Sequence, residues 1–291
     1  MNHATTLREL LQREDRSLIV PGAGTPLEAL AIERAGFEAL YLSGYAIAAW
    51  RHGLPDIGLL GAGELMDALY AVKRVSNLPI IVDADTGYGD VTSVYANVRL
   101  LEAAGAAAIQ IEDQVWPKKC GHMVGKEVID ADEAVRKVAT ALDARRNPNT
   151  MIIARTDALG PRGIDEALER ARRFADVGAD VVFLDAPSSR EDLVRIGQTV
   201  PGFLMANVSE GGRTPTLLAS DFHELGFRLV IYPTTPLRLA AKTIADFLTD
   251  LRSEGDSLAW RERMYGLEEL NGLVRLEDYL VIGDREDARH V

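Results

Sequence analysis

The sequence predicts an α/β protein, a (β/α)8 barrel of the TIM type. Short apolar runs alternate with helix-like stretches along the chain, and eight such pairs fit within about 230 residues. Most of the apolar runs are nearly continuous, which is typical of parallel strands covered on both faces. An open doubly wound sheet is the alternative. After the first run, however, Gly22–Gly24 lacks the third glycine and the acidic partner of a dinucleotide-binding turn.

Each expected strand is rich in β-branched and other apolar residues. The eight strands are expected at Leu18–Pro21, Ala39–Ser43, Pro79–Asp83, Ala107–Glu112, Thr150–Arg155, Val181–Asp185, Phe203–Asn207 and Leu229–Tyr232. Helices are expected between them at Pro26–Ala35, Gly63–Val75, Val91–Ala104, Asp132–Arg145, Asp165–Val177 and Arg190–Thr199. Glycines 36, 105 and 178 each stand at the end of a helix, where glycine permits the left-handed turn into the next strand.

No sharp change in composition divides the chain, so we expect one catalytic barrel domain over residues 1–253. Residues 254–291 form a charged, partly helical tail. An apolar stripe in it is formed by Trp260, Met264, Tyr265 and Leu267. We expect the tail to pack on the barrel or on a neighbouring subunit.

Composition narrows the class of protein. The formal net charge of −12 argues against nucleic acid as a partner, because phosphate binding needs a basic face. No stretch approaches the roughly 20 apolar residues of a membrane helix. The polar N-terminus lacks an apolar signal core, and the single cysteine fits a reducing compartment, so we expect a cytoplasmic protein.

Polar residues recur at the carboxyl ends of the expected strands, where the catalytic groups of such barrels gather. In chain order they are Ser43, Gly44, Tyr45, Asp83, Asp85, Glu112, Arg155 with Asp157, Asp185, Asn207, Ser209 and, beyond the last strand, Arg238. Each alone has an ordinary explanation as a helix cap, a surface ion pair or a turn residue. Their convergence on one end of the barrel indicates an active site.

Three of these acids favour a metal site. Asp83, Asp85 and Glu112 offer carboxylate oxygens from adjacent strands, which suits Mg2+ or Mn2+ better than zinc. The five histidines show no zinc-ligand spacing. Arg155 and Arg238 can clamp carboxylates, so the substrate is expected to be a di- or tricarboxylic acid held on a cation.

The only cysteine, Cys120, lies in the basic, glycine-broken segment Lys118–His122. Neighbouring ammonium groups and an imidazole stabilise a thiolate, so we expect a thiol available for proton transfer. A small buried hydrophobic residue is the plain alternative for a lone cysteine.

With these motifs in view, the chain resembles the isocitrate lyase / phosphoenolpyruvate mutase superfamily from Gly24 to about Lys242. The matching segments are Tyr41–Gly44, Gly53–Asp56, Val82–Gly89, Ile111–Gln114, Lys118–His122, Ala154–Ala158 and Ala206–Glu210. The cysteine-containing segment is the most specific of them, because it looks like the gating loop of the carbon–carbon lyases.

The resemblance implies a barrel whose last helix is exchanged between subunits of a homotetramer, a dimer of dimers. It also implies Mg2+-dependent cleavage of a 2-hydroxy di- or tricarboxylic acid to an α-keto acid such as pyruvate and a carboxylic acid. Asp83, Asp85 and Glu112 would hold the metal.

The resemblance also implies roles for the other residues. The keto-acid half would lie on Ser43, Gly44, Tyr45 and Arg155. The far carboxylate would contact Asn207, Ser209 and Arg238, and further substrate-binding residues would be Gly121, His122 and Asp185. Cys120 would close over the site with Gly121 and protonate the enolate-like product on carbon. Tyr41 is one candidate for the base that takes the 2-hydroxyl proton.

Several readings stay open. Methylisocitrate lyases usually carry glycine where Tyr45 stands and glutamate where Asp185 stands, and they use a C-terminal arginine where this chain has Met264 beside Arg263. A smaller 2-alkylmalate, such as dimethylmalate, fits a pocket narrowed by Tyr45. Oxaloacetate decarboxylase or hydrolase is the second enzymatic alternative, a phosphonate mutase the third, and a non-catalytic scaffold barrel the last.

Overall fold

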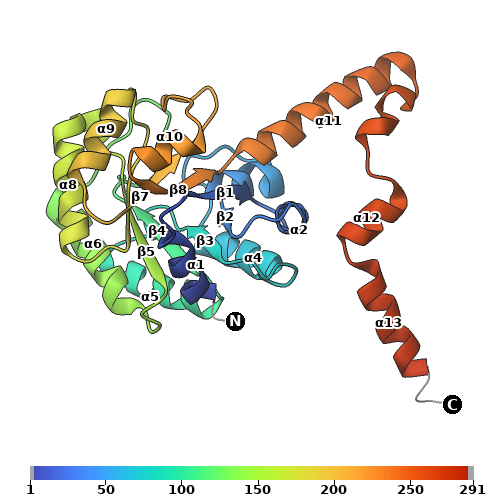
Figure 1. The fold of residues 1–291 in the computed structure, drawn as a ribbon, viewed down its shortest axis with the longest axis horizontal. Helices are drawn as coiled ribbons and strands as arrows, with labels where there is room; N and C mark the ends of the chain where they lie inside the picture. Colours follow the sequence, from blue (N-terminus) through green and yellow to red (C-terminus); the bar gives the residue numbers. More distant parts are fainter. Residues whose placement is uncertain (1–2, 288–291) are drawn as a thin grey trace.

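The computed structural model describes residues 3–287, and its centre is a closed barrel of eight strands in sequence order (Figure 1). The strands are β1 (Leu18–Ala23), β2 (Leu40–Leu42), β3 (Ile80–Asp83), β4 (Ala108–Glu112), β5 (Met151–Thr156), β6 (Val181–Leu184), β7 (Phe203–Asn207) and β8 (Phe227–Tyr232). Every neighbouring pair is parallel, and β1 pairs with β8 to close the sheet. The predicted fold is confirmed.

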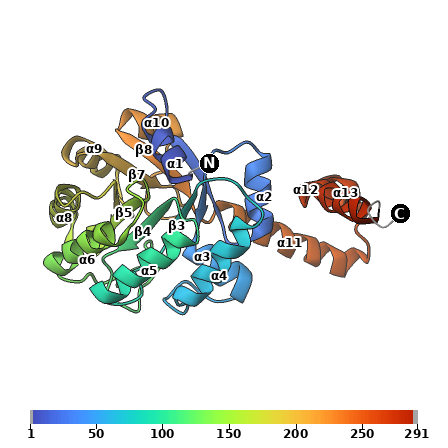
Figure 2. The same cartoon turned by 90° about the horizontal axis from the view of Figure 1, so that it is seen from below.

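Helices follow the strands and cover the outside of the barrel (Figures 1 and 2). They are α1 (His3–Leu11), α2 (Pro26–Arg34), α3 (Gly44–Ala46), α4 (Ala62–Lys73), α5 (Val91–Ala103), α6 (Ala131–Ala144), α7 (Leu159–Arg162), α8 (Ile164–Asp176), α9 (Arg190–Thr199), α10 (Ala219–Glu224), α11 (Thr235–Glu254), α12 (Leu267–Leu273) and α13 (Leu276–Asp287). A π-helical turn (Ile47–Arg51) extends α3, and a 3-10 turn (Leu258–Arg263) precedes α12. All predicted strands and helices agree with the observed bounds within two residues.

The barrel interior is filled by side chains from all eight strands. Buried residues of α1, among them Leu7 and Leu11, belong to the same apolar cluster as Tyr41, Ile81 and Phe183. A packed interior leaves no channel through the barrel, so a substrate site is confined to a barrel end.

Strand register brings the polar strand ends together. Glu112 of β4 lies opposite Arg155 of β5, and Asp83 of β3 lies opposite Gln110. A single antiparallel bridge between Gln114 and Val128 then closes the base of the long connection from β4 to α6. We call residues 115–127 the thiol loop.

The last strand is followed by α11, which leaves the barrel and carries the tail away from it (Figure 1). Only Leu237 of this helix is buried. The tail returns to α2, where Arg275 pairs with Glu33 at 3.2 Å and the Arg34 guanidinium donates to the Glu269 carbonyl at 3.3 Å. The predicted tail extends to residue 291, and residues 288–291 lie outside the described range. Within that range, no helix has both the length and the apolar character of a membrane span.

Candidate active site

A cavity of about 590 Å³, open toward solvent, lies at the carboxyl ends of the strands. Its walls bring together residues from the ends of β2, β3, β5, β6, β7 and β8 and from the thiol loop. The predicted residues that line it are Tyr41, Ser43, Tyr45, Asp83, Cys120, Gly121, His122, Arg155, Asp185, Asn207 and Ser209. Chain segments that are far apart in sequence therefore form one site, as the strand-end pattern predicts.

Asp83, Asp85 and Glu112 form a buried cluster beside this cavity, with one oxygen of each within 4.8 Å of the others. Asp85 has a left-handed backbone (φ 46°), which is rare for a residue with a side chain and is characteristic of functional sites. Gly44 lies against the cluster, since a methyl group on it would be 3.5 Å from both Asp83 Oδ2 and Asp85 Oδ1. The three acids are close enough together to hold a divalent cation.

The raised pKa values of two of these acids also indicate a place for a cation. Burial, together with Asp83 and Asp56, raises the pKa of Asp85 to about 7, although Lys118 opposes the shift. Burial also raises the pKa of Glu112 well above its usual range, although Arg155 opposes it. The Glu112 Oε1 atom is buried without a hydrogen-bond partner. Buried carboxylates short of positive charge are natural ligands for Mg2+ or Mn2+, so the donor set fits.

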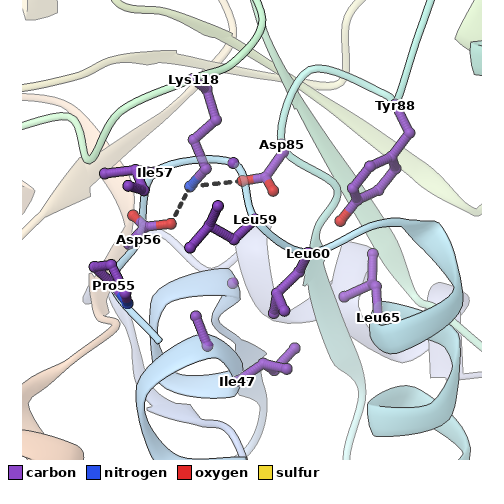
Figure 3. A pocket seen from close by; sticks show the side chains of 13 residues that line it. Ile47, Pro55, Asp56, Ile57, Leu59, Leu60, Leu65, Asp85, Tyr88 and Lys118 are labelled. Atoms are coloured by element: carbon purple, nitrogen blue, oxygen red, sulfur yellow. Dashed lines mark hydrogen bonds and ion pairs between the residues drawn. The ribbon is translucent and has the colours of Figure 1, made fainter. Parts of the chain in front are cut away.

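The Lys118 ammonium lies between Asp56 and Asp85 (Figure 3). It is 2.7 Å from Asp85 Oδ1, and the side chain is 5% exposed. Burial would lower its pKa, but the two carboxylates hold the pKa well above its usual range. Apolar side chains, labelled Ile47, Leu59, Leu60 and Leu65 in Figure 3, line the adjoining pocket of about 320 Å³ and keep this ion pair in apolar surroundings.

The predicted electrostatics of Cys120 are therefore wrong. Lys118 is neutralised by carboxylates, and the Lys119 ammonium donates to the Gly125 carbonyl at 2.7 Å on the surface. Burial raises the pKa of the Cys120 thiol, although the backbone N–H of His122 opposes the shift. The thiol accordingly keeps its proton at neutral pH, which suits a proton donor rather than a nucleophile.

Tyr41 lies at the floor of the cavity, fully buried. Its hydroxyl donates to Gln110 Oε1 at 3.0 Å, and the Gln110 amide donates to Asp83 Oδ1 at 3.1 Å. Burial and the nearby Asp83 raise the pKa of the phenol well above its usual range. A phenol that keeps its proton is a poor base, so its geometry favours orienting Gln110 and Asp83 over the suggested proton abstraction.

Arg155 is the cation at the centre of the cavity wall. Its Nε donates to Asp157 Oδ2 at 2.8 Å, and its Nη2 donates to Asp185 Oδ2 at 2.8 Å and to Asp157 Oδ1 at 3.0 Å. Glu112 lies 3.3 Å from Nε. The pair with Asp157 is buried, so the alternative of a surface pair is wrong. The hydrogen bonds that Arg155 makes within residues 3–287 run from Nε and Nη2, and the residue lines the cavity.

The thiol loop is held against the cavity by its backbone. The Cys120 N–H donates to the Asp56 carbonyl at 3.2 Å. The next residue, Gly121, lies directly against the cavity wall. A methyl group on it would lie 1.6 Å from Asp185 Oδ2 and 2.4 Å from Arg155 Nη2. Only glycine fits this loop position in the observed, closed arrangement.

His122 joins the thiol loop to the segment after β7. Its Nδ1 accepts the Arg213 backbone N–H at 3.1 Å, and its Nε2 is 3.3 Å from Asn207 Nδ2. The Asn207 amide also donates to Asp185 Oδ1 at 3.2 Å. Burial lowers the pKa of His122, so the imidazole is neutral at neutral pH. His122, Asn207 and Asp185 therefore form one hydrogen-bonded polar wall of the cavity.

The remaining predicted residues differ in their placement. Ser43 lines the cavity, but its Oγ also accepts the Ala46 N–H at 3.2 Å and so caps α3. Tyr45 lies on the cavity wall and is half-exposed. The structure does not bring Arg238 into the cavity lining. Arg238 lies on the first turn of α11, and its guanidinium donates to the Glu210 carbonyl at 2.7 Å.

Sequence reasoning left several cavity residues without a role. They are Asp56, Lys118, Phe183, Ile231, Pro233 and Thr234. Asp56 stands in the matched segment Gly53–Asp56, away from any strand end, so the strand-end rule does not reveal it. Phe183 alternates along β6 with outward-facing residues, and its ring lies 5.3 Å from the Arg155 guanidinium carbon. Only that inward alternation could have indicated it.

Comparison with known proteins shows which family the chain resembles. The phosphoenolpyruvate phosphomutase family model matches residues 7–252. The chain is 43% identical to 2,3-dimethylmalate lyase of Eubacterium barkeri, over 95% of this chain and 96% of that protein. It is 45% identical to probable 2-methylisocitrate lyase 1 of Corynebacterium glutamicum, over 90% of this chain and 86% of that protein.

Comparison with solved structures gives the same family. A crystal structure of 2,3-dimethylmalate lyase superposes with a TM-score of 0.92 at 33% identity and covers 98% of this chain and 96% of that one. Oxaloacetate acetylhydrolase bound to 3,3-difluorooxalacetate gives a TM-score of 0.92 at 30% identity, over 98% and 97% of the two chains. The chain belongs to the isocitrate lyase / phosphoenolpyruvate mutase superfamily. The predicted superfamily is confirmed, and the names of these relatives bear out the predicted class of carbon–carbon lyase.

Proposed function

We propose that this protein is a Mg2+-dependent lyase that cleaves a 2-alkylmalate-like acid to an α-keto acid such as pyruvate and a carboxylic acid. The observation that carries the proposal is the single cavity in which a protonated thiol, Cys120, and the Arg155 guanidinium lie beside the buried acids Asp83, Asp85 and Glu112. The relatives named as 2,3-dimethylmalate lyase and 2-methylisocitrate lyase support it.

The chemistry follows from these groups. A divalent cation on the three acids would stabilise negative charge on the keto-acid oxygens. Arg155 binds the keto-acid carboxylate, and Ser43 and Gly44 support the same half of the substrate. The 2-hydroxyl gives its proton to solvent water as the bond from C2 to C3 breaks, and the electron pair of that bond passes to C3. Cys120 then gives its proton to C3, and solvent later returns a proton to the sulfur.

The charges in the cavity favour a dicarboxylate over a tricarboxylate. The acids at the cavity are Asp56, Asp83, Asp85, Glu112 and Asp185, whereas the cations are Lys118 and Arg155. Lys118 is already held by two of these acids, so we assign the substrate carboxylate to Arg155. With Asp83, Asp85 and Glu112 assigned to the divalent cation, both side-chain cations left for a third substrate carboxylate are already paired with acids. Tyr45 narrows the same cavity, which supports the smaller 2-alkylmalate over methylisocitrate.

A screen of 2-hydroxy acids tests this proposal. The purified protein is incubated with Mg2+ and dimethylmalate, citramalate, methylisocitrate, isocitrate or oxaloacetate, and pyruvate is detected by NADH oxidation with lactate dehydrogenase; oxalate, glyoxylate and succinate are detected by chromatography. We expect pyruvate from the alkylmalates at a higher kcat/KM than from methylisocitrate. Cleavage of oxaloacetate alone would replace the lyase proposal with the hydrolase alternative.

The same proposal includes a homo-oligomer in which α11 packs on a second subunit. The apolar side chains of this helix at Leu239, Ile244 and Leu248 are exposed in the single chain. An apolar surface groove lies near its start, lined by residues that include Ile19, Phe37 and Tyr232. We expect light scattering after size exclusion to give a tetramer, and Leu248→Lys to reduce its mass; a monomer would contradict this.

A further inference from the structure

One buried cation is not used by the proposed chemistry. Lys126, at the far end of the thiol loop, places its Nζ 2.6 Å from Asp157 Oδ1. The two side chains are 3% and 0% exposed. Lysine is almost never fully buried unless it is paired, so the ion pair with Asp157 is what allows Lys126 to be buried.

The partner of Lys126 is also the partner of the cavity arginine. Asp157 follows β5 directly, and its backbone N–H donates to Asp113 Oδ1 at 2.8 Å, which fixes its position. Its Oδ2 accepts Arg155 Nε, while its Oδ1 accepts both Arg155 Nη2 and Lys126 Nζ. The same oxygen is therefore shared by the arginine of the site and the lysine of the loop.

The position of Lys126 along the thiol loop allows the ion pair to anchor one end of the loop. The loop base is pinned by the Gln114–Val128 bridge, and the loop is anchored at its entry by Lys118 on Asp85 and at its exit by Lys126 on Asp157. Cys120 and Gly121 lie between the two anchors. Opening the loop would withdraw Lys126 and leave Asp157 with Arg155 as its only cation.

We propose that Lys126 is a positioning residue whose ion pair with Asp157 latches the thiol loop closed and sets the orientation of the Arg155 guanidinium. When Lys126 shares the charge of Asp157, Arg155 is held less exclusively by that acid and its guanidinium stays turned to the cavity. By thermodynamic reciprocity, binding of an anion at Arg155 and closure of the loop favour each other. The inference rests on the proposed role of Arg155 in carboxylate binding.

Alkylation of Cys120 by iodoacetamide reports loop closure without requiring turnover. The rate is measured at one pH for the full-length protein, with and without Mg2+ and oxalate. The variants are Lys126→Met and Asp157→Asn. The second substitution keeps the side-chain volume of Asp157. Lys119→Met is the matched control, because its ammonium lies on the same loop but contacts only a surface carbonyl. Circular dichroism and thermal unfolding establish that each variant is folded.

We expect both variants to raise the alkylation rate about tenfold or more. Lys126→Met removes the ion pair that holds the loop on Asp157, and Asp157→Asn leaves the buried Lys126 charge without its acid. We also expect both to lose most of the protection that Mg2+ and oxalate give, whereas Lys119→Met stays within about twofold of wild type. Lys126→Arg, which keeps the charge, should restore part of the protection. A purely structural role would lower thermal stability without changing the dependence of alkylation on oxalate.

An unchanged alkylation rate and unchanged oxalate protection in whichever of the two variants folds would overturn the latch. Kinetics then separate this result from failure of the proposed function. A wild-type protein that releases no keto acid from any hydroxy acid refutes the lyase proposal alone, whereas a latch failure in an active enzyme refutes only the role of Lys126.

Discussion

Replacing Gly121 by alanine tests whether the thiol loop must reach the cavity wall. The added methyl group would lie 1.6 Å from Asp185 Oδ2 and 2.4 Å from Arg155 Nη2, far inside van der Waals contact. The loop must then lift, or the buried ion pair of Arg155 and Asp185 must part. Overpacking costs about 1–3 kcal/mol and breaking a buried pair about 3–5 kcal/mol. Because about 1.4 kcal/mol is a factor of ten, kcat/KM should fall about 10- to 100-fold or more.

The assay is the coupled measurement of pyruvate release over a range of substrate concentrations. Gly63→Ala is the matched control, because Gly63 lies in α4 and a methyl group there has no neighbour within 4 Å. The backbone of Gly121 is not in the left-handed region, so the substitution acts through space and not through backbone strain. Gly121→Ala with a kcat/KM within about twofold of wild type would refute closure over Arg155 and Asp185.

Three further predictions concern the thiol and the metal acids. Cys120→Ser should lower kcat about 100-fold or more with KM little changed, since general acid catalysis contributes about 10²–10⁴; an unchanged kcat would remove Cys120 as the acid. Asp85→Ala should abolish turnover, as should EDTA, with Mg2+ or Mn2+ restoring only the wild type; recovery of the variant in excess Mg2+ would show an indirect role. Because burial raises the pKa of Cys120, its alkylation rate should rise only at higher pH than that of free cysteine, and a midpoint at or below the usual value would contradict its environment.

The barrel could be predicted from sequence because its strands are buried on both faces. The runs Ile80–Val82 and Val181–Leu184 are apolar throughout and each is followed directly by an aspartate, so the strand bounds can be read directly from the sequence. The helix-ending glycines behave as expected, with positive φ at Gly36, Gly105 and Gly178. In a closed parallel barrel, the strand ends then have only one place to meet.

The charges at Cys120 could not be predicted in the same way. Nearness in sequence placed Lys118 beside the thiol, but the ammonium turns to Asp56 and Asp85, which are far from it in sequence. Local sequence gives the sign of a neighbouring charge and not its partner. The pairing of Lys126 with Asp157 was hidden for the same reason, because it depends on how the thiol loop folds back on β5.

The proposed function depends most on a divalent cation lying beside the thiol in one cavity. Diffraction from crystals grown with Mn2+ and oxalate tests this directly through the anomalous signal of the ion. We expect one strong peak within coordination distance of the Asp83, Asp85 and Glu112 cluster, directly or through water, with oxalate between the ion and Arg155 and the Cys120 sulfur facing the oxalate. A peak elsewhere, or oxalate bound without the ion and away from Cys120, would contradict it.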